Sequence, residues 1–372
     1  MLTSCLAIFG LVAITGLGAA TCAQLPDEQI AARFAPVFHQ ALAEHPRGDY
    51  ITNFDFDGDW DGTNNWDHAA ETAFKLKGYI YYSVAETPTH YLIHYAVFHA
   101  RDYKGGDTKG VIYSKVLRNA ARILSRGAEP SGRLAEAVIA HENDMEGALV
   151  VVEKHGTDLA AARIVFVETL HHNMFSRYVP EDSDRPAEGR FTVDGLHVEL
   201  YVEPKGHGVV PWGTQPDKPE KGWLVYTYAG HADDPESISG GLVGYQLLPI
   251  STTLWPKARD SVTNRTFTSF RDFGTMTISI LSGGAAVARN VVLGSLASAF
   301  HGNVGGVNVA RPPWGWVSND HRDDPPGVWF FDPARIVKRD FRLADGFSTS
   351  YMKVPFWASG AESETTAAVS NK

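Results

Sequence analysis

The sequence predicts a mainly β protein, built as an antiparallel β-sandwich with peripheral helices. Short runs rich in β-branched and aromatic residues recur between Gly, Pro, Asn and Asp, at residues 78–84, 90–99, 148–153, 163–168, 196–203 and 223–228. These runs lack the regular intervening helices that a sheet of parallel β-α-β units requires. Antiparallel sheets packed face to face are therefore the expected architecture.

A few helices are expected beside the sheets. The first begins near Pro26, where two acidic residues follow the proline and apolar residues recur at helical spacing. Its apolar face would comprise Ile30, Phe34, Val37, Phe38, Ala41 and Leu42. Helical periodicity also predicts helices at residues 115–126, 133–140 and 284–300. The last of these is rich in Gly and Ala, which would let it pack closely on a sheet.

The N-terminal segment predicts export. Residues 6–20 form an apolar run of the length of a signal-peptide core, which is too short to span a membrane comfortably. Small residues then predict cleavage after Ala23, so residues 1–23 would be a signal peptide and the mature protein would be secreted or periplasmic. The alternative is lipid anchoring through Cys22, because a small-residue stretch that ends in cysteine resembles a bacterial lipobox.

Length and charge limit the classes of partner. The 372 residues carry 33 Lys and Arg against 43 Asp and Glu, for a formal net charge of -10. An acidic chain without a basic face is not expected to bind nucleic acid. Phosphate loops and dinucleotide fingerprints are absent from the sequence, so no nucleotide cofactor is expected. Residues 24–358 are expected to form one domain, followed by a disordered polar tail at 359–372.

One segment combines residues that can bind a metal. Residues 140–147 read Ala-His-Glu-Asn-Asp-Met-Glu-Gly and run directly into the apolar strand 148–152. Asp144 and Glu146 would share one face of this strand, and His141 could fold over from the preceding turn. Imidazole nitrogen with carboxylate oxygen suits Mg²⁺, Ca²⁺ or Mn²⁺, or Zn²⁺ if four ligands close around it. The alternative is a strand edge that its charges keep soluble.

This segment resembles the hallmark heptapeptide Gly-His-Arg-His-Asp-Trp-Glu of the necrosis- and ethylene-inducing-like proteins. His141, Asp144 and Glu146 match its first His, its Asp and its Glu. Upstream, residues 91–102 resemble the family's strand of alternating aromatics, whose final aspartate also binds the metal and is matched by Asp102. Downstream, residues 203–208 resemble a later turn beside the same site and contain His207.

The resemblance covers roughly residues 34–230 and has clear departures. Met145 stands in place of the tryptophan, Ala140 in place of the leading glycine, and Asn143 in place of the second histidine. Residues 103–140 are expected to form a helical insertion where the family has a short loop. The resemblance implies a secreted β-sandwich that holds a divalent cation in an acidic pocket, used by toxic members to engage sphingolipid headgroups. The target does not transfer, because the loops that select it differ.

A second acidic cluster resembles the start of a calcium loop. Asp57, Asp59 and Asp61 alternate before a glycine, but the twelfth position holds His68 instead of a bidentate Glu. A polar turn that presents its acids near the main site is therefore favoured over an independent calcium site.

The remaining histidines differ in the strand face on which each is expected to lie. His94 and His99 should lie on opposite faces of one strand, with His99 the better candidate for the site. His171 and His172 should also split across two faces, so both are interpreted as packed or surface residues instead of ligands.

Two functions from different classes follow from these residues. In the first, the protein is a secreted, cytolysin-like effector whose cation, held by Asp102, His141, Asp144 and Glu146, bridges it to a membrane lipid headgroup or a glycan. In the second, it is a metal-dependent hydrolase acting on a glycan or phosphoester, with His207 or His99 as the catalytic general base. Catalytic turnover would distinguish the hydrolase from the binding protein. A third alternative is a structural envelope protein whose site is vestigial.

Overall fold

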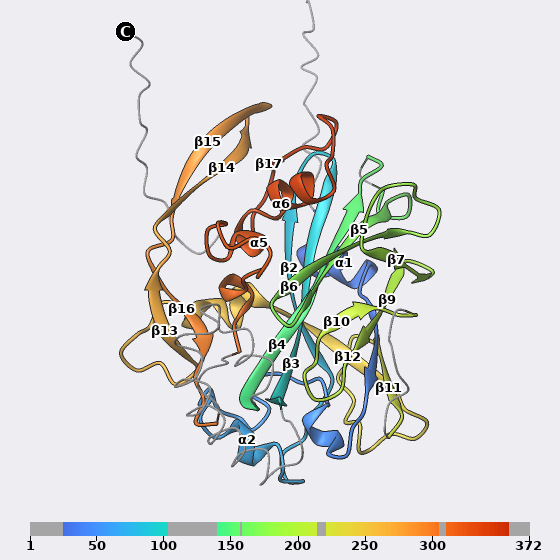
Figure 1. Ribbon diagram of the computed structural model, residues 1–372, viewed down its shortest axis with the longest axis vertical. Helices are drawn as coiled ribbons and strands as arrows, with labels where there is room; N and C mark the ends of the chain where they lie inside the picture. The colour runs from blue at the N-terminus through green and yellow to red at the C-terminus, as the bar shows by residue number, and fades with distance from the viewer. Residues whose placement is uncertain (1–24, 103–139, 157, 214–220, 305–309, 357–372) are drawn as a thin grey trace, which may run out of the picture.

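The computed structural model describes residues 25–102, 140–156, 158–213, 221–304 and 310–356 (Figure 1). The expected signal peptide, Cys22, the disordered tail, the helix at 115–126 and nearly all of the insertion at 103–140, with the helix at 133–140, lie outside these ranges. Within them, every helix is too short or too polar to cross a membrane.

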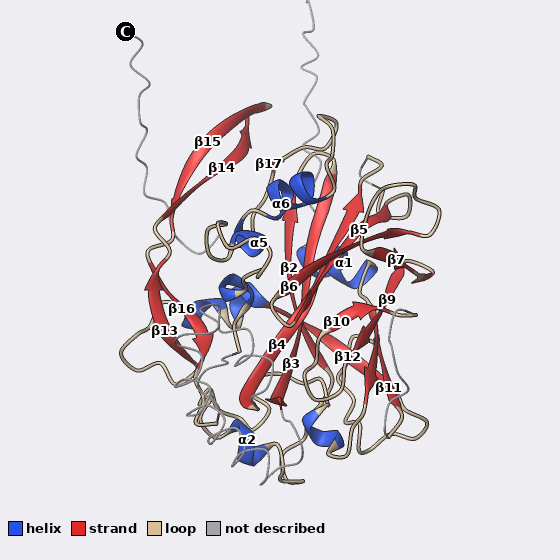
Figure 2. Ribbon diagram, viewed as in Figure 1, coloured by secondary structure: helices blue, strands red, loops and turns tan. Residues whose placement is uncertain are grey.

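The protein is mainly β, as predicted, and most of its strands belong to one sheet (Figure 2). The order is β10-β9-β1-β11-β12-β2-β3-β4-β5-β6-β7, with β8 paired to β9. The bounds are β1 (Val37–Ala41), β2 (Tyr79–Glu86), β3 (His90–Asp102), β4 (His141–Glu153), β5 (Arg163–His171), β6 (Met174–Pro180), β7 (Gly189–Phe191), β8 (Val193–Asp194), β9 (His197–Val202), β10 (Val209–Pro211), β11 (Trp223–Tyr228) and β12 (Leu242–Pro249).

The pairing of this sheet differs from the antiparallel sandwich that the sequence predicts. Strands β2 to β6 do form an antiparallel series. The pairs β1-β9, β11-β12, β12-β2 and β6-β7 are parallel, so the sheet is mixed. It curls until it is nearly closed into a barrel, with β10 lying against β5 and β4. Composition marks each strand but does not record which distant strands pair, because pairing is a non-local property.

The first predicted helix is shorter than expected. Helix α1 spans Asp27–Arg33, and residues 37–41 form strand β1. Pro36 separates the two elements, because a proline disfavours helical backbone at the residue before it and cannot donate a helical hydrogen bond. The apolar residues that seemed to continue one helical face are the buried residues of a strand, as Phe38 shows.

The helix expected at residues 284–300 is wrong. This segment forms β15 (Ala285–Val292) and β16 (Ser295–Phe300). Strand β15 pairs along its whole length with β14 (Thr275–Ser282), and β16 pairs with β13 (Phe267–Asp272). The turn between β14 and β15 is Gly283-Gly284, and both glycines have positive φ, as a two-residue hairpin requires. Small residues here serve a hairpin instead of close helix packing.

Two hydrophobic clusters lie on the two faces of β2 to β5. The inner cluster joins strands from both halves of the sheet to α1 and includes Phe38, Ile93, Tyr95, Val150 and Tyr226. The outer cluster is covered by the C-terminal part of the chain, including α5 (Val328–Phe331) and α6 (Pro333–Asp340). Residues beyond 249 thus form most of the layer that covers the outer face of the sheet (Figure 1).

One contact between this outer layer and β4 is unusually close. The buried indole of Trp316 donates from Nε1 to the carbonyl oxygen of Met145, at 2.9 Å. A Cβ at Gly147 would lie 3.0 Å from the Trp316 ring and 2.2 Å from the carbonyl oxygen of Tyr95. Only glycine therefore fits at residue 147.

Gly147→Ala should lower the free energy of unfolding by about 3 kcal/mol, because the added methyl group collides with backbone that cannot move without disturbing the sheet. Gly346→Ala is the matched control, since a Cβ there meets nothing within 4 Å. Urea unfolding of both variants measures the difference. Equal stability of the two variants would contradict the close approach of Trp316 and Tyr95.

A buried carboxyl group lies between the sheet and the outer layer. Glu168 on β5 is fully buried, and its Oε2 accepts a hydrogen bond of 2.5 Å from Nε1 of Trp329. Burial raises the pKa of Glu168 to about 8, and the neighbouring carboxylate of Asp340 adds to the rise. The folded protein therefore keeps a proton on Glu168 at a pH where the unfolded chain has lost it.

Glu168→Gln should flatten the pH dependence of stability. Because the pKa of Glu168 is about 8 in the folded state against 4.5 ordinarily, its contribution is complete below pH 4.5 and is lost as the pH rises through 8. Over that window the variant should gain stability relative to the wild type as the pH rises. Urea unfolding at three pH values tests this, with the exposed Glu181→Gln as control. Parallel pH profiles for wild type and Glu168→Gln would refute it.

Candidate functional site

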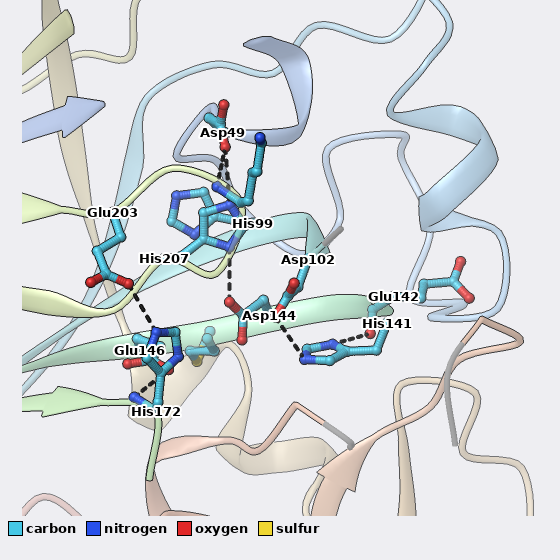
Figure 3. A network of polar contacts seen from close by, with 12 residues as sticks. Asp49, His99, Asp102, His141, Glu142, Asp144, Glu146, His172, Glu203 and His207 are labelled. Carbon is cyan, nitrogen blue, oxygen red and sulfur yellow. Dashed lines mark hydrogen bonds and ion pairs between the residues drawn. The ribbon is translucent and has the colours of Figure 1, made fainter. Parts of the chain in front are cut away.

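The candidate site lies where the nearly closed sheet brings β10 against β5 and β4 (Figure 3). Its polar side chains come from the ends of β3, β4 and β5, from the turn between β9 and β10, and from the segment after the 3-10 turn η1 (Pro46–Gly48). The residues are Asp49, His99, Asp102, His141, Asp144, Glu146, His171, His172, Glu203 and His207. All four predicted metal ligands and His207 lie in this part of the fold, but no three of the four ligands have donor atoms within 4.8 Å of one another.

The start of β4 presents its side chains as the sequence predicts, with one irregularity. Asp144 lies opposite His99 of β3 in the sheet register, and Met145 points to the outer cluster on the other face. Asn143 has a φ of 60°, which interrupts the regular alternation of the strand. His141 accordingly reaches Asp102, with 3.4 Å between its Nε2 and Oδ2 of the carboxylate (Figure 3).

Asn143 and Glu142 hold this part of β4 in place. The Nδ2 of Asn143 donates to the carbonyl oxygens of Gly62 and His301, at 2.7 and 2.5 Å. The Glu142 carboxylate accepts hydrogen bonds from the backbone amides of three residues in neighbouring loops, Trp66, Asn303 and Val304. Neither role can be predicted from local sequence, because the partners are far away along the chain.

His207 is held between two carboxylates. Its Nδ1 lies 2.8 Å from Oδ2 of Asp144, and its Nε2 lies 3.5 Å from Oδ1 of Asp49. Burial by itself lowers the pKa of His207, but the two carboxylates outweigh burial and raise the pKa to about 9. Burial has the opposite effect on an acid and by itself would raise the pKa of Asp144. The hydrogen bond to His207 and the nearby imidazoles outweigh burial and lower this pKa. The pair is therefore ionised at neutral pH.

His99 stacks on His207 and is neutral. The ring centroids are 3.7 Å apart with an interplanar angle of 3°. Burial and the charge of His207 lower the pKa of His99 well below its ordinary value, and its Nε2 donates to Oε1 of Gln40 at 2.9 Å. A buried, protonated His207 has no lone pair with which to accept a proton. This geometry does not favour His207 as the general base of a hydrolase.

Only one of the two side-chain oxygens of Glu146 has a hydrogen-bond partner among the described residues. Its Oε1 accepts a bond of 3.3 Å from the backbone amide of His172, whereas its buried Oε2 has no hydrogen-bond partner among the described residues. Burial raises the pKa of Glu146 well above its ordinary range, and the charges of Asp144, Glu203 and Asp102 add to the rise. A cation at this position would supply the missing counter-charge.

His171 and His172 both bind Glu203, so the expected split of these histidines across two faces is wrong. Their Nε2 atoms each lie 2.9 Å from a different oxygen of Glu203. His172 has a φ of 48°, which takes it out of extended backbone and turns its ring toward its neighbour. Within the described ranges, these three residues form the only set of three or more His, Cys, Asp or Glu whose ligand atoms all lie within 4.8 Å of one another.

Unusual backbone is concentrated at this site. Seven described residues other than glycine have positive φ, and five of them lie here: Asn143, His172, Asn173, Lys205 and His207. Such conformations cost roughly 1–3 kcal/mol each and persist only where the surrounding structure enforces them. His172 and Asn173 form the two-residue turn between β5 and β6, where positive φ at both residues is the usual hairpin geometry. Asn143, Lys205 and His207 have no such explanation and lie directly at the site.

The second acidic cluster is a self-contained turn. Oδ2 of Asp57 lies 2.6 Å from Nδ1 of His68, and Oδ1 of Asp59 accepts the backbone amide of Asp61 at 2.7 Å. Burial would raise the pKa of Asp61, but hydrogen bonds from Arg265 and from residue 63 lower it to about 2. The structure therefore places these acids against donors of the protein.

Comparisons with known proteins give low similarities. No family model and no curated protein matches the chain. Among solved structures, it is similar to necrosis and ethylene inducing protein 2 from the causal agent of witches' broom disease of cocoa, at 16% identity and a TM-score of 0.29, over 54% of this chain and 76% of the other. It is similar to the non-toxic protein HaNLP3 at 11% identity and a TM-score of 0.28, over 59% and 73%.

A third structure, NLPPya in complex with glucosamine, shares 15% identity at a TM-score of 0.27, over 51% of this chain and 70% of that chain. These solved structures are of the family that residues 141–146 resemble, and the similarities are low. At this level of similarity, the function has to be argued from the site itself.

Proposed function

We propose that the protein is a secreted, cytolysin-like effector that attaches to a cell-surface headgroup or glycan through a divalent cation. The cation would be held by Asp102, His141, Asp144 and Glu146. The observation that supports this most directly is the buried Oε2 of Glu146, which has no hydrogen-bond partner among the described residues and lies among other carboxylates. A bound cation would satisfy this oxygen and offset the repulsion between the acids.

The donor set favours a hard cation. Three carboxylates and one imidazole offer mainly oxygen ligands, which suits Mg²⁺, Ca²⁺ or Mn²⁺ better than Zn²⁺. A cation that keeps open positions could also accept oxygens from an anionic or polyhydroxyl ligand. The positive charge would let a protein with a formal net charge of -10 approach such a ligand.

Asp144→Asn and Glu146→Gln should each weaken binding of Mg²⁺, Ca²⁺ and Mn²⁺ by about 100-fold or more, since loss of a direct ligand exceeds the effect of losing a supporting residue. Glu146→Gln is the cleaner variant, because it leaves the ion pair between Asp144 and His207 intact. Asp59→Asn in the second acidic cluster is the control. Calorimetric titration measures the affinities. Full affinity in Glu146→Gln, or a loss only in Asp59→Asn, would overturn the assignment.

Attachment to the target should require the cation. Wild-type protein should bind sphingolipid-containing vesicles or a glycan array in the presence of the cation, lose this binding in a chelator, and recover it when the cation is added back. Glu146→Gln should not bind under any of these conditions. Glucosamine and mannosamine, the sugars bound in two of the solved structures, are practical first competitors. Attachment that survives chelation would refute the proposed bridging role of the cation.

A further inference from the structure

The cluster of His171, His172 and Glu203 has a ligand chemistry of its own. Two imidazole nitrogens face one carboxylate, at 2.9 Å in both cases. The two rings come from consecutive residues, and their centroids are 4.4 Å apart. In a regular strand these rings would point to opposite faces, so their convergence depends on the positive φ of His172.

The turn that carries Glu203 also has unusual backbone geometry. Glu203 follows β9 and begins a turn in which Lys205 and His207 both have positive φ. A Cβ on Gly208 would lie only 2.4 Å from the Cδ2 atom of His171 and 3.1 Å from Oε2 of Glu203. The turn can approach the end of β5 this closely only because residue 208 is glycine.

We propose that His171, His172 and Glu203 form a second metal site, selective for Zn²⁺, that joins the end of β5 to the turn after β9. Two imidazoles with one carboxylate are a donor set that zinc uses where a fourth position stays open. Hard cations such as Mg²⁺ and Ca²⁺ prefer oxygen, so this site differs in selectivity from the acid-rich set on β3 and β4. The two sites share none of their proposed ligands.

The spacing of the ligand atoms is compatible with a metal ion after local adjustment of the side chains. Ligand atoms about 2.0–2.1 Å from a tetrahedral zinc ion lie roughly 3.3 Å apart. The two nitrogen–oxygen separations of 2.9 Å, each to a different oxygen of Glu203, are within a few tenths of an ångström of this spacing, and one ligand atom from each of the three residues lies within 4.8 Å of the other two. The side chains of His171, His172 and Glu203 are 24%, 43% and 25% exposed, which gives an ion access from solvent.

The test is a Zn²⁺ titration of the full chain in excess Mg²⁺, followed by calorimetry. Wild type should bind one Zn²⁺, and His172→Ala and Glu203→Gln should each weaken that binding by about 100-fold or more. His155→Ala is the matched control, because His155 is also exposed and also lies near a carboxylate, 3.6 Å from Oε2 of Glu153. It should bind Zn²⁺ as the wild type does. Substitution with Co²⁺ should give the visible absorption of a four-coordinate ion.

A fourth variant separates this site from the one proposed above. Asp102→Asn should lose the hard cation but keep Zn²⁺, whereas Glu203→Gln should do the reverse. Circular dichroism shows that each variant is folded before titration. The proposal is overturned if the wild type binds no Zn²⁺, if His155→Ala loses it as fully as His172→Ala, or if Asp102→Asn loses it while His172→Ala keeps it.

Discussion

The ion pair between His207 and Asp144 joins the turn after β9 to β4, two parts of the sheet that are not neighbours in the strand order. His207 lies after β9, at one end of the strand order, and Asp144 lies on β4, well inside it. Asp49 completes the contact and accepts the backbone amide of Lys205 at 2.7 Å. Because a buried charge is tolerated only when it is paired, all three groups must be present together. The polar site is thus also the seam that nearly closes the sheet.

Local periodicity predicted much of this seam. Asp144 and Glu146 share a face, and His94 and His99 lie on opposite faces, because side chains alternate along a strand regardless of what the strand pairs with. His94 accordingly lies against Trp329 of the outer layer, at 3.0 Å from its carbonyl oxygen, while His99 stacks on His207. The outer layer itself was not predicted, since its alanine-rich strands at 285–300 have no apolar alternation that distinguishes them from a helix.

The remaining errors arise from single backbone reversals and from contacts between distant segments. A positive φ at His172 brings two consecutive rings to one carboxylate, which no spacing rule anticipates. Asn143 makes its hydrogen bonds to residues near 62 and 301, so its role depends on how the whole chain folds. The parallel pairing of β12 with β2 likewise joins segments more than 150 residues apart, as the register of Gln246 with Tyr79 shows.

The outer layer explains how β4 accommodates methionine at position 145. Met145 is buried against the outer cluster. The indole of Trp316 packs over Gly147, the next residue on the same face of the strand, and donates a hydrogen bond to the carbonyl oxygen of Met145. An indole therefore covers this face of the strand although the local residue is not aromatic. Since Asp144 and Glu146 flank Met145 on the opposite face, packing by a distant segment fixes the backbone from which both carboxylates project. The residues beyond 249 consequently help to position the site without contributing a proposed ligand.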